Sequence, residues 1–249
     1  MHSSNGIEVR NLSFSYSGKP ALADASFQAR AGKFTGLLGP NGAGKSTLLS
    51  LLTGLLGRGR GEISIDGIDI HKHPRQALGR VGIVFQQSAL DLDLTLEQNM
   101  VYGAALRGWW GKDARRKINQ ALELMNITDQ RRDKVRELNG GHRRRLEIAR
   151  ALVHQPAVLI LDEPTVGLDI RTRNELVTHV HQLTTSENIT VLWASHLVDE
   201  IRETDDLVVL NKGQVCSAGP VTQLLQQYAC PTVLSLFERL TCTDQSLAD

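Results

Sequence analysis

The sequence predicts an α/β protein in which a largely parallel sheet carries helices on its faces. Short apolar or alternating segments recur along the chain, and beyond residue 156 they alternate with helical patterns. A glycine-rich loop also stands between a predicted strand and a predicted helix, at residues 34–54. In sheets of this kind, ligands bind beyond the carboxyl ends of the strands. We therefore look for the site at those ends.

The first part of the chain contains the predicted strands that come before this alternation. They are IEVRNLSFSY (7–16), FTGLLG (34–39), GEISIDGIDI (61–70) and RVGIVFQ (80–86). From about residue 94 the apolar residues recur three and four apart, which is typical of helices. The helical segments are LEQNMVYGAAL (96–106), DARRKINQALELM (113–125) and RRLEIARALV (144–153). We expect this helical block to be inserted into the α/β chain.

The second part returns to alternating strands and helices. The predicted elements are a strand in AVLILDEP (157–164), a helix in RTRNELVTHVHQL (171–183), a strand in ITVLWASH (189–196) and a short helix from Leu197. DLVVLNKGQVCSAG (206–219) reads as a hairpin that turns at Lys212-Gly213. The tail from Val221 is weakly helical.

Composition excludes several classes of protein. With 28 basic and 27 acidic residues, the net charge of +1 gives neither the basic excess of a nucleic-acid-binding protein nor a disordered composition. Cys216, Cys230 and Cys242 have no C-x-x-C spacing, so we expect neither a zinc site nor a disulfide framework, and a reducing cytosol. The apolar runs are too short to cross a bilayer, and no leader pattern is visible, so we expect a soluble chain.

The glycine-rich loop fits the pattern G-x-x-x-x-G-K-[ST], which predicts a P-loop that binds a nucleoside triphosphate. Glycines let backbone N–H groups wrap around phosphates, and the helix N-terminus adds partial positive charge. We expect Lys45 to reach the terminal phosphates, Ser46 to ligate Mg²⁺ and Thr47 to lie near the α-phosphate. The expected nucleotide-binding residues of this loop are Gly39, Pro40, Asn41, Gly42, Ala43, Gly44, Lys45, Ser46 and Thr47.

A second site must hold the metal and activate water. The strand AVLIL ends in two consecutive carboxylates, Asp162 and Glu163, which alternation directs to different sides. We assign Asp162 to the magnesium shell and Glu163 to the attacking water as general base.

These motifs, taken in order, resemble the ATP-binding subunit of an ABC transporter. The resemblance covers Gly6 to about Leu225. It implies an ABC-type ATPase domain over 1–225, with an antiparallel β subdomain and a helical subdomain inserted at about 88–152, and a short extension over 226–249. The family pattern implies that Tyr16 of FSYSGKPAL stacks on adenine, that Gln86 of VFQQ lies near metal and water, and that His196 of WASH is the catalytic switch histidine. Asp169 of LDEPTVGLD ends a family loop, or equally caps the next helix.

The segment ELNGGHRRRLEIARAL (137–152) occupies the family's signature position, with two departures. In the family, this helix points its N-terminus at the γ-phosphate held by a second subunit, so Asn139, Gly140 and Gly141 become nucleotide-binding residues. Asn139 replaces serine and is an equally good N-cap, whereas His142 replaces glutamine. Because imidazole titrates near neutral pH, we expect ATP hydrolysis to be retained but altered. The arginines at 143–145 lie near the positive end of this helix, where their charges are unfavourable. Either the partner's triphosphate or solvent would offset this repulsion.

The resemblance also predicts partners and place. We expect ATP and Mg²⁺ as cofactors, a second ATPase subunit in a head-to-tail dimer, a transmembrane permease subunit, no nucleic acid, and a peripheral position on the cytoplasmic face of the inner membrane. Two alternatives remain: a nucleotide-gated regulatory or binding module with weak ATPase activity, and a soluble ABC ATPase that is not coupled to transport. Exporter subunits are the most similar. Trp109 and Trp110 either dock the partner or pack at a helix end.

Overall fold

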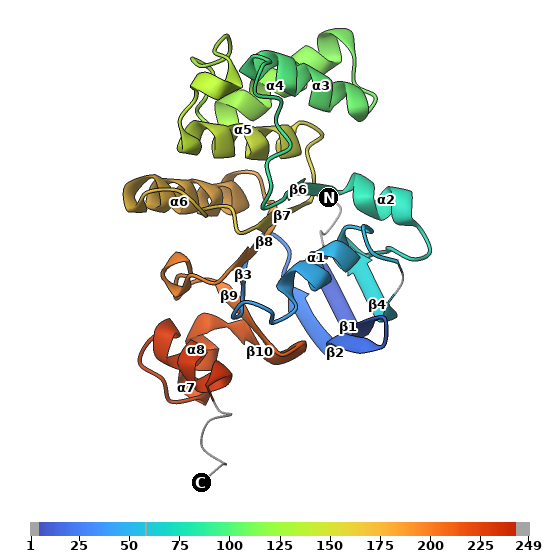
Figure 1. Cartoon of the computed structure of the whole chain (residues 1–249), viewed down its shortest axis with the longest axis vertical. Helices are drawn as coiled ribbons and strands as arrows, with labels where there is room; N and C mark the ends of the chain where they lie inside the picture. Colours follow the sequence, from blue (N-terminus) through green and yellow to red (C-terminus); the bar gives the residue numbers. More distant parts are fainter. Residues whose placement is uncertain (1–4, 58, 243–249) are drawn as a thin grey trace.

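The computed structural model describes residues 5–57 and 59–242 of the chain. Figure 1 shows a group of helices at one end of the molecule, a central sheet next to it, and a second sheet at the side of the central one. The outer ends of the expected ATPase domain and of the C-terminal extension, residues 1–4 and 243–249, lie outside the described residues.

A six-stranded sheet forms the centre of the molecule. Its strands, in spatial order, are β10 (Gln214–Pro220), β9 (Asp206–Asn211), β3 (Phe34–Leu38), β8 (Thr190–Ser195), β7 (Val158–Asp162) and β6 (Val81–Val84). All neighbours pair in parallel except β10, which returns antiparallel to β9 through the turn at Lys212-Gly213. Every residue of β3, β7 and β8 is buried, as expected for parallel strands that are covered on both faces.

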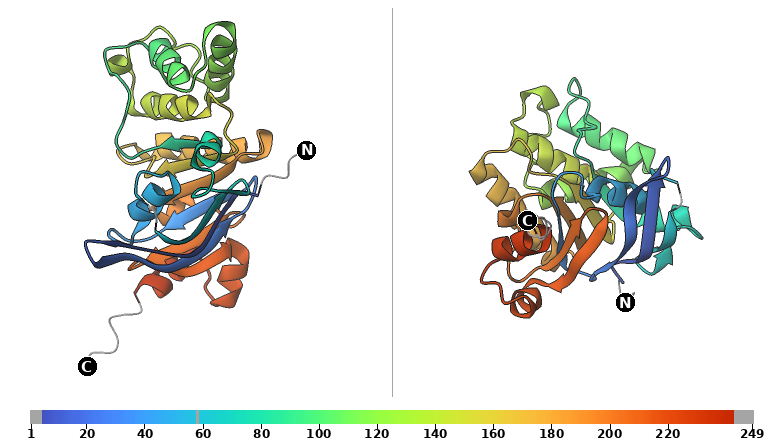
Figure 2. Two further views of the ribbon diagram at one scale, coloured as in Figure 1. Left: turned by 90° about the vertical axis from the view of Figure 1, so that its right-hand side faces the viewer. Right: turned by 60° about the horizontal axis from the view of Figure 1, so that its bottom comes forward.

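A second, antiparallel sheet has the order β2 (Lys19–Ala29), β1 (Ile7–Tyr16), β4 (Arg60–Ile65) and β5 (Ile68–Asp69). Helix α1 (Lys45–Leu52) joins the two sheets, since its buried leucines share one apolar cluster with residues of β1, β2 and β7. The short helix α2 (Pro74–Gly79) follows β5. Figure 2 shows from two further sides that β1 and β2 lie beside β10, where β2 contacts that strand.

The helical block contains α3 (Leu96–Leu106), α4 (Gly111–Leu124), the 3₁₀ turn η1 (Val135–Glu137) and α5 (Gly140–Leu152). These helices lie together at one end of the molecule, with α6 (Ile170–Ser186) packed against α5 (Figure 1). A capping box between Thr95 and Gln98 begins α3. The 3₁₀ turn η2 (Val198–Glu200) follows β8, and α7 (Val221–Gln227) and α8 (Val233–Thr241) complete the described chain.

The structure confirms the predicted fold class and adds two elements that sequence patterns did not predict. Sequence patterns did not predict β2, because Asp24 adopts a positive φ of 53° and register shifts with β1 interrupt the alternation. Helix α2, with Pro74 at its start, is too short to show a period. The short helix expected from Leu197 is present as a single 3₁₀ turn, Val198–Glu200. None of the helices in residues 5–57 and 59–242 has the length and apolar content needed to span a bilayer.

His154 follows α5 and makes folding sensitive to acid. Burial and the charge of Arg107 lower the pKa of its imidazole from 6.5 to about 4. The Nε2 atom lies 3.0 Å from the carbonyl oxygen of Val81, while Nδ1 is buried without a hydrogen-bond partner among the described residues. The folded state therefore holds this histidine neutral.

We predict that this stabilisation is complete above pH 6.5 and is lost as the pH falls toward about 4, by at most about 3 kcal/mol, since only the unfolded state takes up the proton. His154→Gln keeps a donor for Val81 but does not titrate, so its free energy of unfolding should decline less over this range. Denaturant unfolding at several pH values measures the effect, with the exposed His73→Gln as control. Equal pH dependence in His154→Gln and the wild type would contradict the prediction.

Candidate functional site

The phosphate loop connects β3 to α1, and its shape depends on glycine at two places. A Cβ on Gly39 would lie 2.4 Å from the carbonyl oxygen of Leu210, so this position admits no side chain without movement of the backbone. Gly44, the N-cap of α1, has a φ of 106°, which is strained for other residues. No side chain caps α1, so the N–H groups of its first turn are available to a bound anion.

A cavity of about 660 Å³ lies over this loop. Several separate parts of the chain line it: Pro20, Ala21, Pro40, Asn41, Gly42, Ala43, Gly44, Lys45, Ser46, Thr47, Gln86, Glu163, Val166, His196, Lys212 and Gly213. The structure thus brings the predicted loop residues other than Gly39 together with all three predicted catalytic residues. Sequence patterns did not predict that two hairpins also line the cavity, at Pro20-Ala21 and at Lys212-Gly213. Tertiary contacts bring them to the phosphate loop; for example, the N–H of Gly213 donates to the carbonyl oxygen of Ala43 at 2.9 Å.

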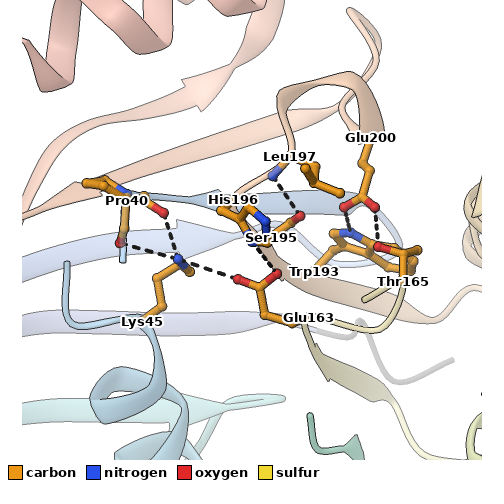
Figure 3. Close-up of polar contacts among 10 residues, drawn as sticks. Pro40, Lys45, Glu163, Thr165, Trp193, Ser195, His196, Leu197 and Glu200 are labelled. Atoms are coloured by element: carbon orange, nitrogen blue, oxygen red, sulfur yellow. Dashed lines mark hydrogen bonds and ion pairs between the residues drawn. The ribbon is translucent and has the colours of Figure 1, made fainter. Parts of the chain in front are cut away.

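Lys45 lines this cavity and is only 7% exposed. Its Nζ donates to the carbonyl oxygen of Gly39 at 2.6 Å and lies 3.5 Å from that of Pro40. A carboxylate oxygen of Glu163 lies 3.6 Å away (Figure 3). The ammonium group is therefore directed toward the space where a triphosphate would lie.

Glu163 and His196 form a hydrogen-bonded pair across the ends of two neighbouring strands. The Nδ1 atom of His196 lies 2.8 Å from Oε2 of Glu163 (Figure 3). Glu163 has a φ of 47°, in the left-handed region, and its N–H donates to the carbonyl oxygen of Ala194 at 2.9 Å. A carboxylate held between a lysine and a histidine is suited to accept a proton from a water molecule in the cavity.

Asp162 is the last residue of β7 and is buried, but it does not line the cavity. Burial raises the pKa of its carboxyl group, and the charge of Glu163 raises it further, while Lys45 and Arg144 act in the opposite direction. A nearby cation would relieve this unfavourable charge. A carboxylate, the hydroxyl of Ser46 and the amide oxygen of Gln86 are oxygen donors of the kinds that Mg²⁺ prefers. Ser46 and Gln86 line the cavity, whereas Asp162 lies outside its lining. No cluster of three His, Cys, Asp or Glu suited to a metal occurs in the part of the chain that the structure describes.

Two arginines of α5 hold the segment around Gln86. Arg144 donates to the carbonyl oxygen of Phe85 at 3.2 Å, and Arg150 donates to that of Ala89 at 2.7 Å. Arg144 also forms a buried ion pair with Glu147, one turn further along α5. Helix α5 therefore fixes the backbone on both sides of Gln86, a relationship that the spacing of residues along the sequence did not reveal.

Helix α5 begins as expected, with Asn139 as the N-cap accepting from the N–H of His142 at 2.8 Å. Asn139, Gly140 and Gly141 do not line the cavity of their own chain. The three arginines at 143–145 also have partners within the chain, which sequence patterns did not predict. Arg143 donates to the carbonyl oxygens of Val135 and Arg136, and Arg145 donates to that of Met125, while Arg144 has the partners given above.

Four further residues that the sequence analysis singled out take simple local positions. Tyr16, at the end of β1, is 48% exposed and does not line the cavity; its ring meets that of Phe14 edge-on, with 5.0 Å between centroids. Asp169 is the N-cap of α6 and accepts from the N–H of Thr172 at 3.0 Å. Trp109 packs against the core beneath Nζ of Lys117, at 4.3 Å from its ring, whereas Trp110 is 70% exposed.

A family model and two curated relatives match most of this chain. The family model described as "ABC transporter" matches residues 22–166. The linearmycin resistance ATP-binding protein LnrL of Bacillus subtilis (strain 168) is 34% identical over 231 residues, 92% of this chain and 74% of that protein. The Nod factor export ATP-binding protein I of Rhizobium johnstonii is 36% identical over 230 residues, 91% of this chain and 73% of that protein.

Two solved structures have similar folds. The protein cbiO1 from Clostridium perfringens, part of the ABC transporter complex cbiONQ, has a TM-score of 0.81 and 28% identity, covering 90% of this chain and 92% of that one. The dimeric structure of MJ0796, a bacterial ABC transporter cassette, has a TM-score of 0.75 and 26% identity, covering 86% of this chain and 98% of that one.

The raised pKa of Asp162 leads to a prediction about stability. The unfolded chain loses this proton near pH 3.8, whereas the folded protein holds it to a higher pH, because the charged form is buried. Stability therefore falls as the pH rises from 3.8 through the folded-state pKa. Asp162→Asn removes the charge. We expect its thermal midpoint in magnesium-free buffer to exceed the wild type's at pH 8, by more than it does at pH 4.5. The exposed Asp129→Asn serves as control. A lower midpoint at pH 8 would contradict this account.

Proposed function

The chain belongs to the ABC transporter family of ATP-binding proteins, and we propose that it powers export of a substrate through a separate transmembrane permease subunit by hydrolysing ATP. The main support for this proposal is that Lys45, Glu163 and His196 line one cavity over the phosphate loop, where Glu163 contacts both of the other side chains. A module that only bound nucleotide would not require a carboxylate and a histidine paired beside the phosphate site, so we favour hydrolysis over the regulatory alternative.

Each residue has a defined role in the proposed reaction. The N–H groups of residues 41–47 and the ammonium group of Lys45 bind the phosphates of ATP. Ser46, Asp162 and Gln86 would hold Mg²⁺, which when bound neutralises charge on the β- and γ-phosphates. Glu163 accepts a proton from the water that attacks the γ-phosphorus, and His196 orients Glu163. The P–O bond to the β-phosphate breaks, which leaves ADP and phosphate.

We further propose that two copies assemble head to tail. Within one chain, Asn139, Gly140 and Gly141 lie outside the cavity, so they would contact a nucleotide only when it is held by a second copy. The free N–H groups at the start of α5 attract an anion, as those of α1 do. The dimeric cassette among the similar structures supports this arrangement.

The permease would contact the helical block near Gln86. Large apolar side chains are exposed on α3 and on the segment that follows it: Val101, Tyr102, Leu106 and Trp110. Exposed apolar groups in such number are typical of a surface that binds another protein. Relatives named for linearmycin resistance and Nod factor export support an exporter role, and they leave the substrate of this chain open. We place the assembly at the cytoplasmic face of the membrane.

Glu163→Gln tests the proposed reaction. The variant keeps Lys45 and the phosphate loop, so it should bind ATP with near wild-type affinity, whereas its turnover should fall at least about 100-fold because the general base is lost. It should also accumulate as an ATP-bound dimer in size-exclusion chromatography. The exposed Glu203→Gln is the matched control. If Glu163→Gln hydrolysed ATP at the wild-type rate, the general-base assignment would be wrong.

A further inference from the structure

Two segments of the chain lie side by side at the site: the turn that follows β7 and the segment that runs from β8 into η2. Two sets of hydrogen bonds connect them. In the first set, Glu163 pairs with His196. In the second, the hydroxyl of Thr165 donates to Oε1 of Glu200, and the indole N–H of Trp193 donates to Oε2 of the same carboxyl group at 2.9 Å (Figure 3). Glu200 thus connects β8, η2 and the turn that follows β7.

Glu200 is an unusual residue to bury. It is 2% exposed, and both of its oxygens are occupied by uncharged donors. Among residues 5–57 and 59–242, no lysine, arginine or histidine forms an ion pair with it. A buried carboxyl group is unfavourable unless hydrogen bonds replace the lost water. The contacts to Thr165 and Trp193 are therefore the interactions that compensate its burial.

The turn that Glu200 holds contains backbone strain. Glu163 adopts a left-handed conformation with a φ of 47°, which for a non-glycine residue costs roughly 1–2 kcal/mol. Such a conformation persists only where the surrounding structure fixes it. On the β7 side it is fixed by the bond from Glu163 N–H to Ala194 O, and two residues later by the buried Thr165. Thr165 is anchored in turn by Glu200.

We propose that Glu200 is a positioning residue for ATP hydrolysis, which acts through Thr165 to keep the carboxylate of Glu163 aligned with His196. The inference rests on the proposed role of Glu163. Glu200 does not line the cavity and does not touch the phosphate loop. Its loss should therefore lower kcat while the KM for ATP stays near the wild-type value, because nucleotide binding depends on residues 40–47 instead.

Four variants separate positioning from simple stability. Glu200→Ala removes both hydrogen bonds. Glu200→Gln retains both, because its amide oxygen accepts from Trp193 and its amide nitrogen donates to the hydroxyl of Thr165. Thr165→Val has nearly the same shape and removes one bond. The double variant Thr165→Val/Glu200→Ala tests whether the two residues act together. Glu203→Ala, an exposed change on the same segment, is the matched control.

ATPase kinetics are measured with purified full-length chain, normalised to the fraction that binds ATP. We expect kcat to fall about 10- to 100-fold in Glu200→Ala and several-fold in Thr165→Val, with KM unchanged, since small misplacement of a reacting group has effects of this size. Glu200→Gln and Glu203→Ala should turn over near the wild-type rate, and the double variant should be no slower than Glu200→Ala.

A wild-type kcat in Thr165→Val, or a Glu200→Gln variant as slow as Glu200→Ala, would overturn the proposal. If Glu200→Ala does not fold, Thr165→Val still decides the question, because its criterion is the wild-type kcat. Glu163→Gln is assayed alongside them: normal turnover there means that the general-base assignment has failed, whereas slow Glu163→Gln with unaffected Thr165→Val means that only the role of Glu200 has failed.

Discussion

A buried ammonium group is the interaction on which the site depends. Lys45 is enclosed by the carbonyl oxygens of its own loop and by the carboxylate of Glu163. An uncompensated charge at such a depth would cost several kcal/mol, so the loop, the end of β7 and the lysine stabilise one another in a single arrangement. The same arrangement places a positive charge and a carboxylate on one wall of the cavity, as transfer of a phosphoryl group to water requires.

The topology of the sheet explains why these groups meet. Strands β3, β8, β7 and β6 are neighbours, and all are parallel. Their carboxyl ends therefore share one edge, where Lys45, His196, Glu163 and Gln86 follow the four strands in that order. Helix α5 starts elsewhere, yet Arg144 and Arg150 connect it to the backbone around Gln86. Helix α5, whose N-cap is Asn139, is therefore hydrogen-bonded to the backbone of the segment that carries Gln86.

Sequence patterns predicted the features that depend on a few consecutive residues. The phosphate loop, the buried strands, the hairpin at Lys212-Gly213 and the cap at Asn139 are of this kind, because their physical causes are local. Contacts between distant segments could not be predicted in this way. The link between Thr165 and Glu200 and the carbonyl partners of Arg143 and Arg145 depend on side-chain packing, and their residue types also suit exposed positions. Strand β2 was missed because a bulge at Asp24 breaks its alternation.

The central claim is that each nucleotide is bound by the phosphate loop of one copy and by the start of α5 of another. Mixing two variants tests it most directly: Lys45→Ala disables the loop, and Gly140→Glu places a carboxylate where the γ-phosphate would lie. Each alone should be inactive. In a mixed dimer one site keeps an intact loop and an intact α5, so the mixture should regain ATPase activity. If the mixture stayed as inactive as its components, the shared site would be contradicted.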